Sequence, residues 1–254
     1  MLIAITREVS PSIGNCELTH LDRIEINVDV ARAQHRNYSH CLSNLGCEVI
    51  ELPAEPDLPD SVFVEDTAVV LDEVAIITRP GAESRRAETP SIAEALAPYR
   101  TLEYIEAPGI LDGGDVLVIG KTLYIGISSR TDAEGIKQMH DILSYYDYIV
   151  EAVDVDECLH LKSALALISP DTLLINRDWV DVDHFSEMKL IDVHPEEPYG
   201  ANALLIAETV IFPARFPRTR ERLDTHGIKS VTIDVSELAK AEGGLTCCSL
   251  IFNT

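Results

Sequence analysis

Paired runs of apolar residues, each broken by a short polar turn, recur along the chain. They are rich in β-branched and aliphatic side chains, so each pair predicts two antiparallel strands. Four pairs are TAVVLDEVAIITR (67–79), DVLVIGKTLYIGIS (115–128), SALALISPDTLLINR (163–177) and NALLIAETVIFPAR (202–215). A fifth pair forms if the C-terminal CSLIFNT meets the N-terminal MLIAITR, so the N-terminal strand is expected to close a ring.

Helical stretches follow most of the strand pairs, and one more short strand follows each of them. The helices are expected within residues 24–46, 84–99, 130–146 and 217–227, with only a short one near DVDHFSEM (181–188). In the third helix, Ile136, Met139, Ile142 and Leu143 are spaced as one helical face. The closing strands are expected in CEVIELP, TLEYIEAP, DYIVEAVDV, KLIDVHP and IKSVTIDV.

The pattern therefore predicts a single α/β domain, residues 1–254, of five strand-strand-helix-strand repeats. Alternating strands and helices usually indicate a doubly wound parallel sheet, but the antiparallel pairs argue against one here. A dinucleotide-binding fold has no support, because no GxGxxG motif follows a strand.

Composition and charge narrow the function classes. The net charge of -23 argues against nucleic acid or an anionic membrane as a partner. No apolar run reaches the roughly 18 residues of a membrane span, and no export signal begins the chain, so a cytoplasmic protein is expected. The six cysteines form no CxxC pair, which makes a zinc knuckle or a thioredoxin-like motif unsupported.

One residue of each repeat lies at the start of its strand pair. These residues are Asp66, Asp112, His160, Asn202 and Cys247, separated by 46, 48, 42 and 45 residues. In a ring of five like units they would point to a common axis, so two carboxylates, an imidazole, an amide and a thiol would meet. A lone histidine or cysteine is more often structural. Several chemically useful residues at one position of the repeat favour a catalytic site with a cysteine nucleophile.

Seven motifs carry a family resemblance in this order and spacing. They are LT (18–19), PDSVFVEDTAVV (59–70), ITRPGAESRRAE (77–88), LDGGDVL (111–117), GISSRTDAEG (126–135), LHLKS (159–163) and GGLTCCS (243–249). With them, nearly the whole chain resembles the dimethylarginine dimethylaminohydrolases of the guanidino-group-modifying, or pentein, superfamily. The resemblance implies a five-bladed α/β-propeller, which agrees with the five repeats.

The resemblance also implies a reaction. It is hydrolysis of N(omega)-methylated L-arginines to L-citrulline and a methylamine through a covalent S-alkylthiouronium intermediate. The cysteine of the Cys-x-Ser pattern falls on Cys247, the family histidine on His160, and the acid that opens xGGD on Asp112, where some members carry Glu. His160 would act first as acid and then as base. No metal or other cofactor is expected, although zinc could inhibit at Cys247 and His160.

A guanidinium is a planar permanent cation, so its site needs carboxylates. Glu65 and Asp66 are candidates beside Asp112. The thiol of an empty site among carboxylates is expected to stay protonated, and a bound cation should promote its ionisation.

The resemblance also implies which residues bind the α-carboxylate and α-amino groups of an amino-acid substrate. It implies that Arg85 and Arg130 bind the substrate carboxylate and that Asp60 lies near the α-amino group. Leu18 falls in a gating segment, IGNCELTHLDR (13–23), called the lid segment below. By its offset from the nucleophile, Ala241 would offer a backbone carbonyl to the ammonium.

Other functions stay open. A deiminase or hydrolase of arginine, or of another guanidino acid, would use the same chemistry, although arginine deiminases and amidinotransferases are longer chains. Agmatine has no carboxylate for Arg85 and Arg130 to bind. A propeller that binds without turnover is a different class, disfavoured because the thiol, imidazole and acid are all present. The expected partner is a small guanidino amino acid, and a monomer and a homodimer are equally compatible with the sequence.

Overall fold

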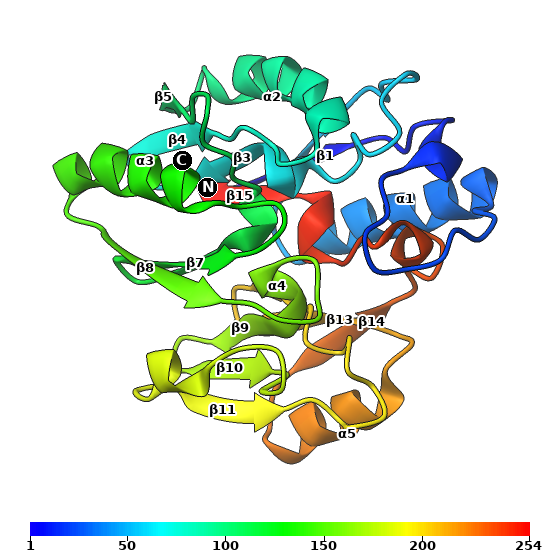
Figure 1. Cartoon of the computed structure of the whole chain (residues 1–254). Coiled ribbons are helices and arrows are strands. Elements are labelled where there is room, and N and C mark those ends of the chain that lie inside the picture. Colours follow the sequence, from blue (N-terminus) through cyan, green and yellow to red (C-terminus); the bar gives the residue numbers. More distant parts are fainter.

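The computed structural model describes residues 1–254 and contains five three-stranded sheets arranged around a centre (Figure 1). The sheets are β15–β1–β2 (Leu250–Asn253, Leu2–Arg7, Glu48–Leu52), β3–β4–β5 (Ala68–Val70, Val74–Ile77, Thr101–Tyr104), β6–β7–β8 (Val116–Ile119, Thr122–Ile127, Ile149–Asp154), β9–β10–β11 (Leu165–Ser169, Thr172–Ile175, Lys189–Asp192) and β12–β13–β14 (Leu204–Ile206, Thr209–Pro213, Ser230–Ile233). In every sheet the first two strands pair antiparallel and the last two pair parallel. The predicted five-repeat α/β-propeller is therefore confirmed.

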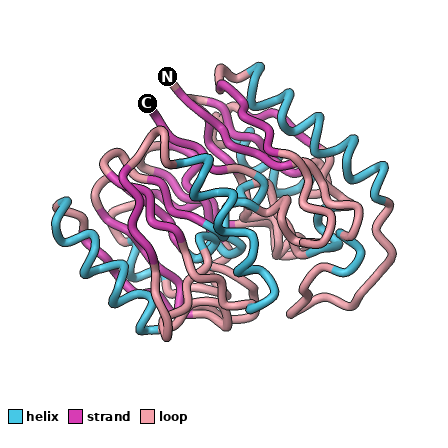
Figure 2. Tube along the Cα trace, turned by 90° about the horizontal axis from the view of Figure 1, so that it is seen from above, coloured by secondary structure: helices cyan, strands magenta, loops and turns pink.

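Helices join the antiparallel pairs to the third strands, because a parallel pairing needs a long crossover connection. They are α1 (Val28–Asn44), α2 (Thr89–Leu96), α3 (Ala133–Leu143) and α5 (Pro217–Thr225), with a 3₁₀ turn (Val182–Phe185) in place of a helix in the fourth repeat. These four helices lie at the periphery of the strands (Figures 1 and 2). None of the helices combines the length and hydropathy that a membrane span requires.

Sequence determines where the helices begin and which face they bury. The side chain of Asn27 accepts a hydrogen bond from the Val30 N–H at the start of α1, and Asp132 caps α3 in the same way through Gly135. On α3, Met139 is fully buried against the strands of two neighbouring sheets, with Ile136 and Leu143 beside it. Burial of each such side chain contributes about 1.5–3 kcal/mol, so the predicted helical face is the one that packs.

The N-terminal strand closes the ring as predicted. β1 pairs antiparallel with β15, with Ile3 opposite Phe252. The backbone N–H of Thr254 donates to the carbonyl of Met1 at 2.9 Å, so the two chain ends lie side by side (Figure 1).

Four short helical turns were not expected from the hydrophobic pattern. They are Val64–Thr67, Gly113–Asp115, α4 (Leu161–Ala164) and Thr246–Cys248, and each one immediately precedes the first strand of a sheet. They occupy the same place in four of the five repeats. Each turn therefore brings a short stretch of backbone to the same end of the strands.

Candidate active site

The four turns carry four of the five residues that share one position of the repeat. Asp66 lies within its turn, Asp112 and His160 stand directly before theirs, and Cys247 lies within the last. The first three offer ligand atoms that all lie within 4.8 Å of one another. Asp66, His160 and Cys247 also line one cavity of about 20 Å³. The predicted convergence of carboxylates, imidazole and thiol is observed.

Two glycines of the LDGGD motif make this convergence possible. A Cβ on Gly113 would lie 2.0 Å from the carbonyl oxygen of Glu65. A Cβ on Gly114 would lie 2.6 Å from Nδ1 of His160 and 2.7 Å from Oδ1 of Asp66. No side chain fits at either position, so the pair of glycines allows three repeats to approach one another closely.

His160 is held between two buried carboxylates. Its Nε2 lies 3.1 Å from Oδ2 of Asp112 and its Nδ1 lies 3.8 Å from Oδ1 of Asp66. The other oxygen of Asp112 accepts the Gly81 N–H at 2.9 Å, which fixes the carboxylate. Burial alone would lower the pKa of His160, but Asp66, Asp112 and Asp115 outweigh it and raise the pKa to about 9. The side chain is therefore an imidazolium at neutral pH.

Asp115 fixes the backbone beside His160. One of its oxygens accepts the Leu161 N–H at 2.9 Å, at the start of α4. The other accepts the hydroxyls of Ser128 and Thr131 at 2.6 and 2.7 Å. This acid ends the LDGGD motif, and no separate role for it could be predicted because its partners come from other segments.

Cys247 is half-buried at the cavity, and the Gly244 N–H donates to its Sγ at 3.3 Å. Burial, reinforced by the carboxylates of Glu65 and Asp66, raises the pKa of the Cys247 thiol well above its ordinary value. The empty site therefore holds a neutral thiol near an imidazolium. At neutral pH an added positive charge in the cavity would favour ionisation of the thiol.

This protonation state predicts slow alkylation of Cys247 by a neutral reagent. Iodoacetamide should react slowly at pH 7, and the rate should climb without a plateau as pH rises past 9, because the thiolate fraction keeps growing. A cationic haloacetamidine should react faster at neutral pH, since its charge stabilises the thiolate. Cys247→Ser identifies the reacting thiol by mass spectrometry. A plateau for iodoacetamide reached below pH 7 would contradict the assignment.

The same cavity is lined by the residues expected at the amino-acid end of a substrate, namely Asp60, Arg85, Arg130 and Ala241. Arg85 is buried and already paired, with Oδ2 of Asp66 at 2.5 Å and Oε2 of Glu88 at 2.8 Å. Arg130 donates through Nη2 to the Thr19 hydroxyl at 3.0 Å. Arg130 is therefore less engaged by protein groups than Arg85 and is better placed to meet a carboxylate.

The lid segment is docked over this cavity. The carboxylate of Glu242 accepts the backbone N–H groups of Thr19, His20 and Leu21 at 2.6–3.1 Å. The carboxylate of Asp60 accepts the Glu17 N–H at 3.1 Å. Leu18, expected to gate the site, is partly buried against the apolar cluster that contains Cys16 and Phe63, and it does not line the cavity.

Glu242 is therefore expected to hold the lid segment closed. Glu242→Ala removes the acceptor for three N–H groups, so KM for the substrate should rise by about tenfold, which corresponds to about 1.4 kcal/mol. Both variants must adopt the left-handed backbone of Glu242, φ 58°, so this strain is common to them. Glu242→Gln keeps one acceptor oxygen, so its KM should rise less than that of Glu242→Ala. Steady-state kinetics of both variants test this, and equal KM values for Ala, Gln and native enzyme would refute it.

Glu65, expected to face the guanidinium, instead contacts the turn that carries Cys247. Its two oxygens accept Lys162 Nζ at 2.6 Å and the Thr246 hydroxyl at 2.7 Å, and it lines a separate groove rather than the cavity. Asn202, the fifth residue of the repeat position, holds the same turn. Its Nδ2 donates to Thr246 Oγ1 at 3.0 Å and its Oδ1 accepts the Thr246 N–H at 3.2 Å.

Asp66, Asp112 and His160 form the one cluster of metal-ligand type. Two carboxylates and an imidazole suit a divalent cation, and such a cation would compete with a guanidinium for the same oxygens. Zinc inhibition through Cys247 and His160 stays a prediction.

The chain is similar over most of its length to known proteins. A family model described as "N,N dimethylarginine dimethylhydrolase, eukaryotic" matches residues 17–252. The N(G),N(G)-dimethylarginine dimethylaminohydrolase of Pseudomonas aeruginosa is 41% identical over 88% of this chain and 90% of that protein. The protein of the same name from Streptomyces coelicolor is 39% identical over 97% of this chain and 95% of that protein.

Solved structures agree with the sequence relatives. A cysteine-to-serine mutant of the Pseudomonas aeruginosa enzyme, complexed with citrulline, superposes with a TM-score of 0.94 at 38% identity, over 98% of each chain. The N-terminal domain of ArgZ, a cyanobacterial arginine dihydrolase, superposes with a TM-score of 0.89 at 18% identity, over 98% of this chain and 97% of that chain. At that identity the second likeness concerns the fold alone.

Proposed function

The chain belongs to the dimethylarginine dimethylaminohydrolase family, and on that premise we propose that it hydrolyses N(omega)-methylated L-arginines to L-citrulline and a methylamine. The observation that carries the proposal is one cavity lined by the Cys247 thiol, the His160 imidazolium and the Asp66 carboxylate, with Asp60 and Arg130 at the same cavity. A guanidino amino acid needs a carboxylate for its guanidinium and an arginine for its carboxylate. Both types of group are present.

Binding of the guanidinium prepares the nucleophile. The cation lies among carboxylates and beside Cys247, so it opposes the effect of burial and of the acidic neighbours on the thiol. The thiol then loses its proton to solvent water, because His160 is already protonated, and the Sγ thiolate attacks the central guanidinium carbon. Substrate binding and thiol ionisation are thereby coupled, which limits reaction of Cys247 with other electrophiles.

His160 moves the protons. As an imidazolium with a pKa of about 9, it donates a proton to the nitrogen of the departing methylamine, and the carbon–nitrogen bond breaks to leave the S-alkylthiouronium adduct. The neutral imidazole then takes a proton from water, and the resulting hydroxide adds to the same carbon. Expulsion of the Cys247 thiolate yields citrulline. Asp112 keeps the ring oriented throughout, through its contact with Nε2.

Parallel assays of citrulline release test the function. Asymmetric dimethylarginine and monomethylarginine should both be turned over, and arginine and agmatine much more slowly or not at all. Turnover of arginine or agmatine alone would assign the protein to the deiminases. No citrulline from any of the four would overturn the proposal.

A further inference from the structure

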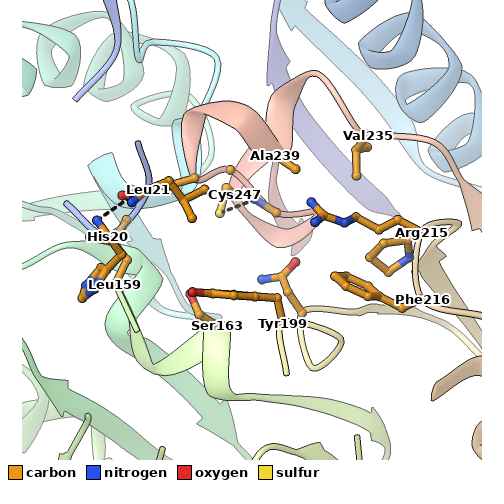
Figure 3. Close-up of a pocket in the computed structure, with 15 residues that line it drawn as sticks. His20, Leu21, Leu159, Ser163, Tyr199, Arg215, Phe216, Val235, Ala239 and Cys247 are labelled. Carbon is orange, nitrogen blue, oxygen red and sulfur yellow. Dashed lines mark hydrogen bonds between the residues drawn. The ribbon is translucent and has the colours of Figure 1, made fainter. Parts of the chain in front are cut away.

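A second cavity opens beside the nucleophile (Figure 3). It measures about 130 Å³, against about 20 Å³ for the cavity at His160. The two cavities share Leu159, Glu242, Gly243 and Cys247, so the thiol stands where they meet. Two methyl groups of a methylated arginine use little of this space.

The second cavity has an apolar wall and one cationic edge. Leu21, Leu159, Phe216 and Val235 contribute apolar side chains. Arg215, in the loop between β13 and α5, reaches from the edge of the cavity toward Cys247 (Figure 3).

The Arg215 guanidinium has no anionic partner in the protein. It forms no hydrogen bond and no ion pair, and its Cζ lies 5.0 Å from the centre of the Phe216 ring. Two nearby arginines, by contrast, have partners: Arg218 pairs with Glu196, and Arg222 donates to the carbonyls of Asp192 and Val193 at 2.9 Å. The first N–H groups of α5 are likewise taken, by the carboxylate of Glu197. Arg215 is therefore a free positive charge facing a cavity in a strongly acidic protein.

The position of a substrate decides what enters this cavity. Asp60, Arg85 and Arg130 line the cavity at His160, so the amino-acid end belongs there. If the guanidinium carbon lies against Cys247, a substituent on the guanidinium nitrogen farthest from the amino-acid end extends into the second cavity. This substituent is the part that leaves as an amine.

We propose that the second cavity binds the leaving amine of larger substrates, namely N(omega)-substituted L-arginines whose substituent is a short alkyl chain ending in a carboxylate. Arg215 pairs with that carboxylate while the alkyl chain lies on Leu159 and Phe216. The inference rests on the proposed function. The step is the same: the Cys247 sulfur–carbon bond forms, the carbon–nitrogen bond to the substituent breaks, and His160 protonates the departing nitrogen. Hydrolysis of the adduct releases citrulline, and the other product is an ω-amino acid.

The test compares two isosteric substrates, N(omega)-(3-carboxypropyl)-L-arginine and its amide, N(omega)-(3-carbamoylpropyl)-L-arginine, with monomethylarginine as reference. The native enzyme should show a kcat/KM about fivefold higher for the acid than for the amide, and high salt should erase the difference, because Arg215 is exposed. Arg215→Gln should remove the preference and Arg215→Glu should reverse it. Arg218→Gln, which changes an arginine outside the cavity, should leave the preference unchanged.

The outcomes separate this inference from the proposed function. Equal kcat/KM for acid and amide in the native enzyme, or an equal loss for both in Arg215→Gln, would overturn the subsite. Turnover of monomethylarginine with no turnover of the carboxypropyl substrate would also overturn it and leave the proposed function standing. Failure of the native enzyme on monomethylarginine would overturn the proposed function itself.

Discussion

Cys247→Ser is expected to abolish citrulline release, with a fall of at least about a thousandfold in kcat. The hydroxyl of serine does not ionise near neutral pH, and no neighbour of Cys247 acts as a strong base toward it, because His160 is already protonated. The adduct with the guanidinium carbon then cannot form. Substrate binding should persist, since Asp66 and Arg130 are untouched.

The neighbouring cysteine supplies the matched control. Cys248 is completely buried and its thiol donates to the carbonyl of Gly244 at 3.4 Å, so it packs under the turn and does not face the cavity. Cys248→Ser should therefore retain turnover, apart from a loss of stability. Continued turnover by Cys247→Ser, or equal loss in both variants, would contradict the role assigned to Cys247.

His160→Asn is expected to have the second largest effect, a fall of about 10²- to 10⁴-fold in kcat. Asparagine cannot carry a proton, so both protonation of the leaving amine and activation of water suffer. The pH profile gives a sharper readout than the rate. In the native enzyme kcat/KM should rise with pH as the thiolate fraction of Cys247 grows and then level off near pH 9 as His160 loses its proton, whereas in the variant it should keep rising past pH 9.

A second histidine controls for surface effects of the substitution. His140 lies exposed on α3, and His140→Asn should leave both kcat and the pH profile unchanged. Retention of the levelling off near pH 9 in His160→Asn would mean that another group supplies the proton.

The five repeats could be predicted from the sequence because strand pairs are local. A run such as residues 115–128 pairs with itself across a short turn, so its own pattern is sufficient. The closure of the ring could also be predicted, because it depends only on pairing between the last strand and the first. The four short turns could not be predicted in this way, since contacts between repeats more than 40 residues apart shape them, as the approach of Gly114 to His160 shows.

The repeat position predicted which residues meet at the cavity, but it could not predict the place of Glu65. Glu65 and Asp66 are adjacent in one tight turn, so their side chains diverge, one toward Lys162 and the other toward Arg85. The repeat position selects Asp66, whereas Glu65 is a candidate only as a neighbouring carboxylate. The contact between Glu242 and the lid segment joins residues more than 200 positions apart, and Arg215 is significant only because it lacks a partner. Such features depend on the folded chain.

During turnover Cys247 is expected to become covalently attached to the carbon of a methylated guanidinium. Rapid acid quench of the native enzyme turning over asymmetric dimethylarginine, followed by peptide mass spectrometry, tests it directly, because an adduct that lies on the reaction path is present during turnover. An added mass equal to the substrate less dimethylamine is expected on the peptide that contains Cys247, and it should be absent from Cys247→Ser. Citrulline formation without any adduct on that peptide, or an adduct on another cysteine, would contradict it.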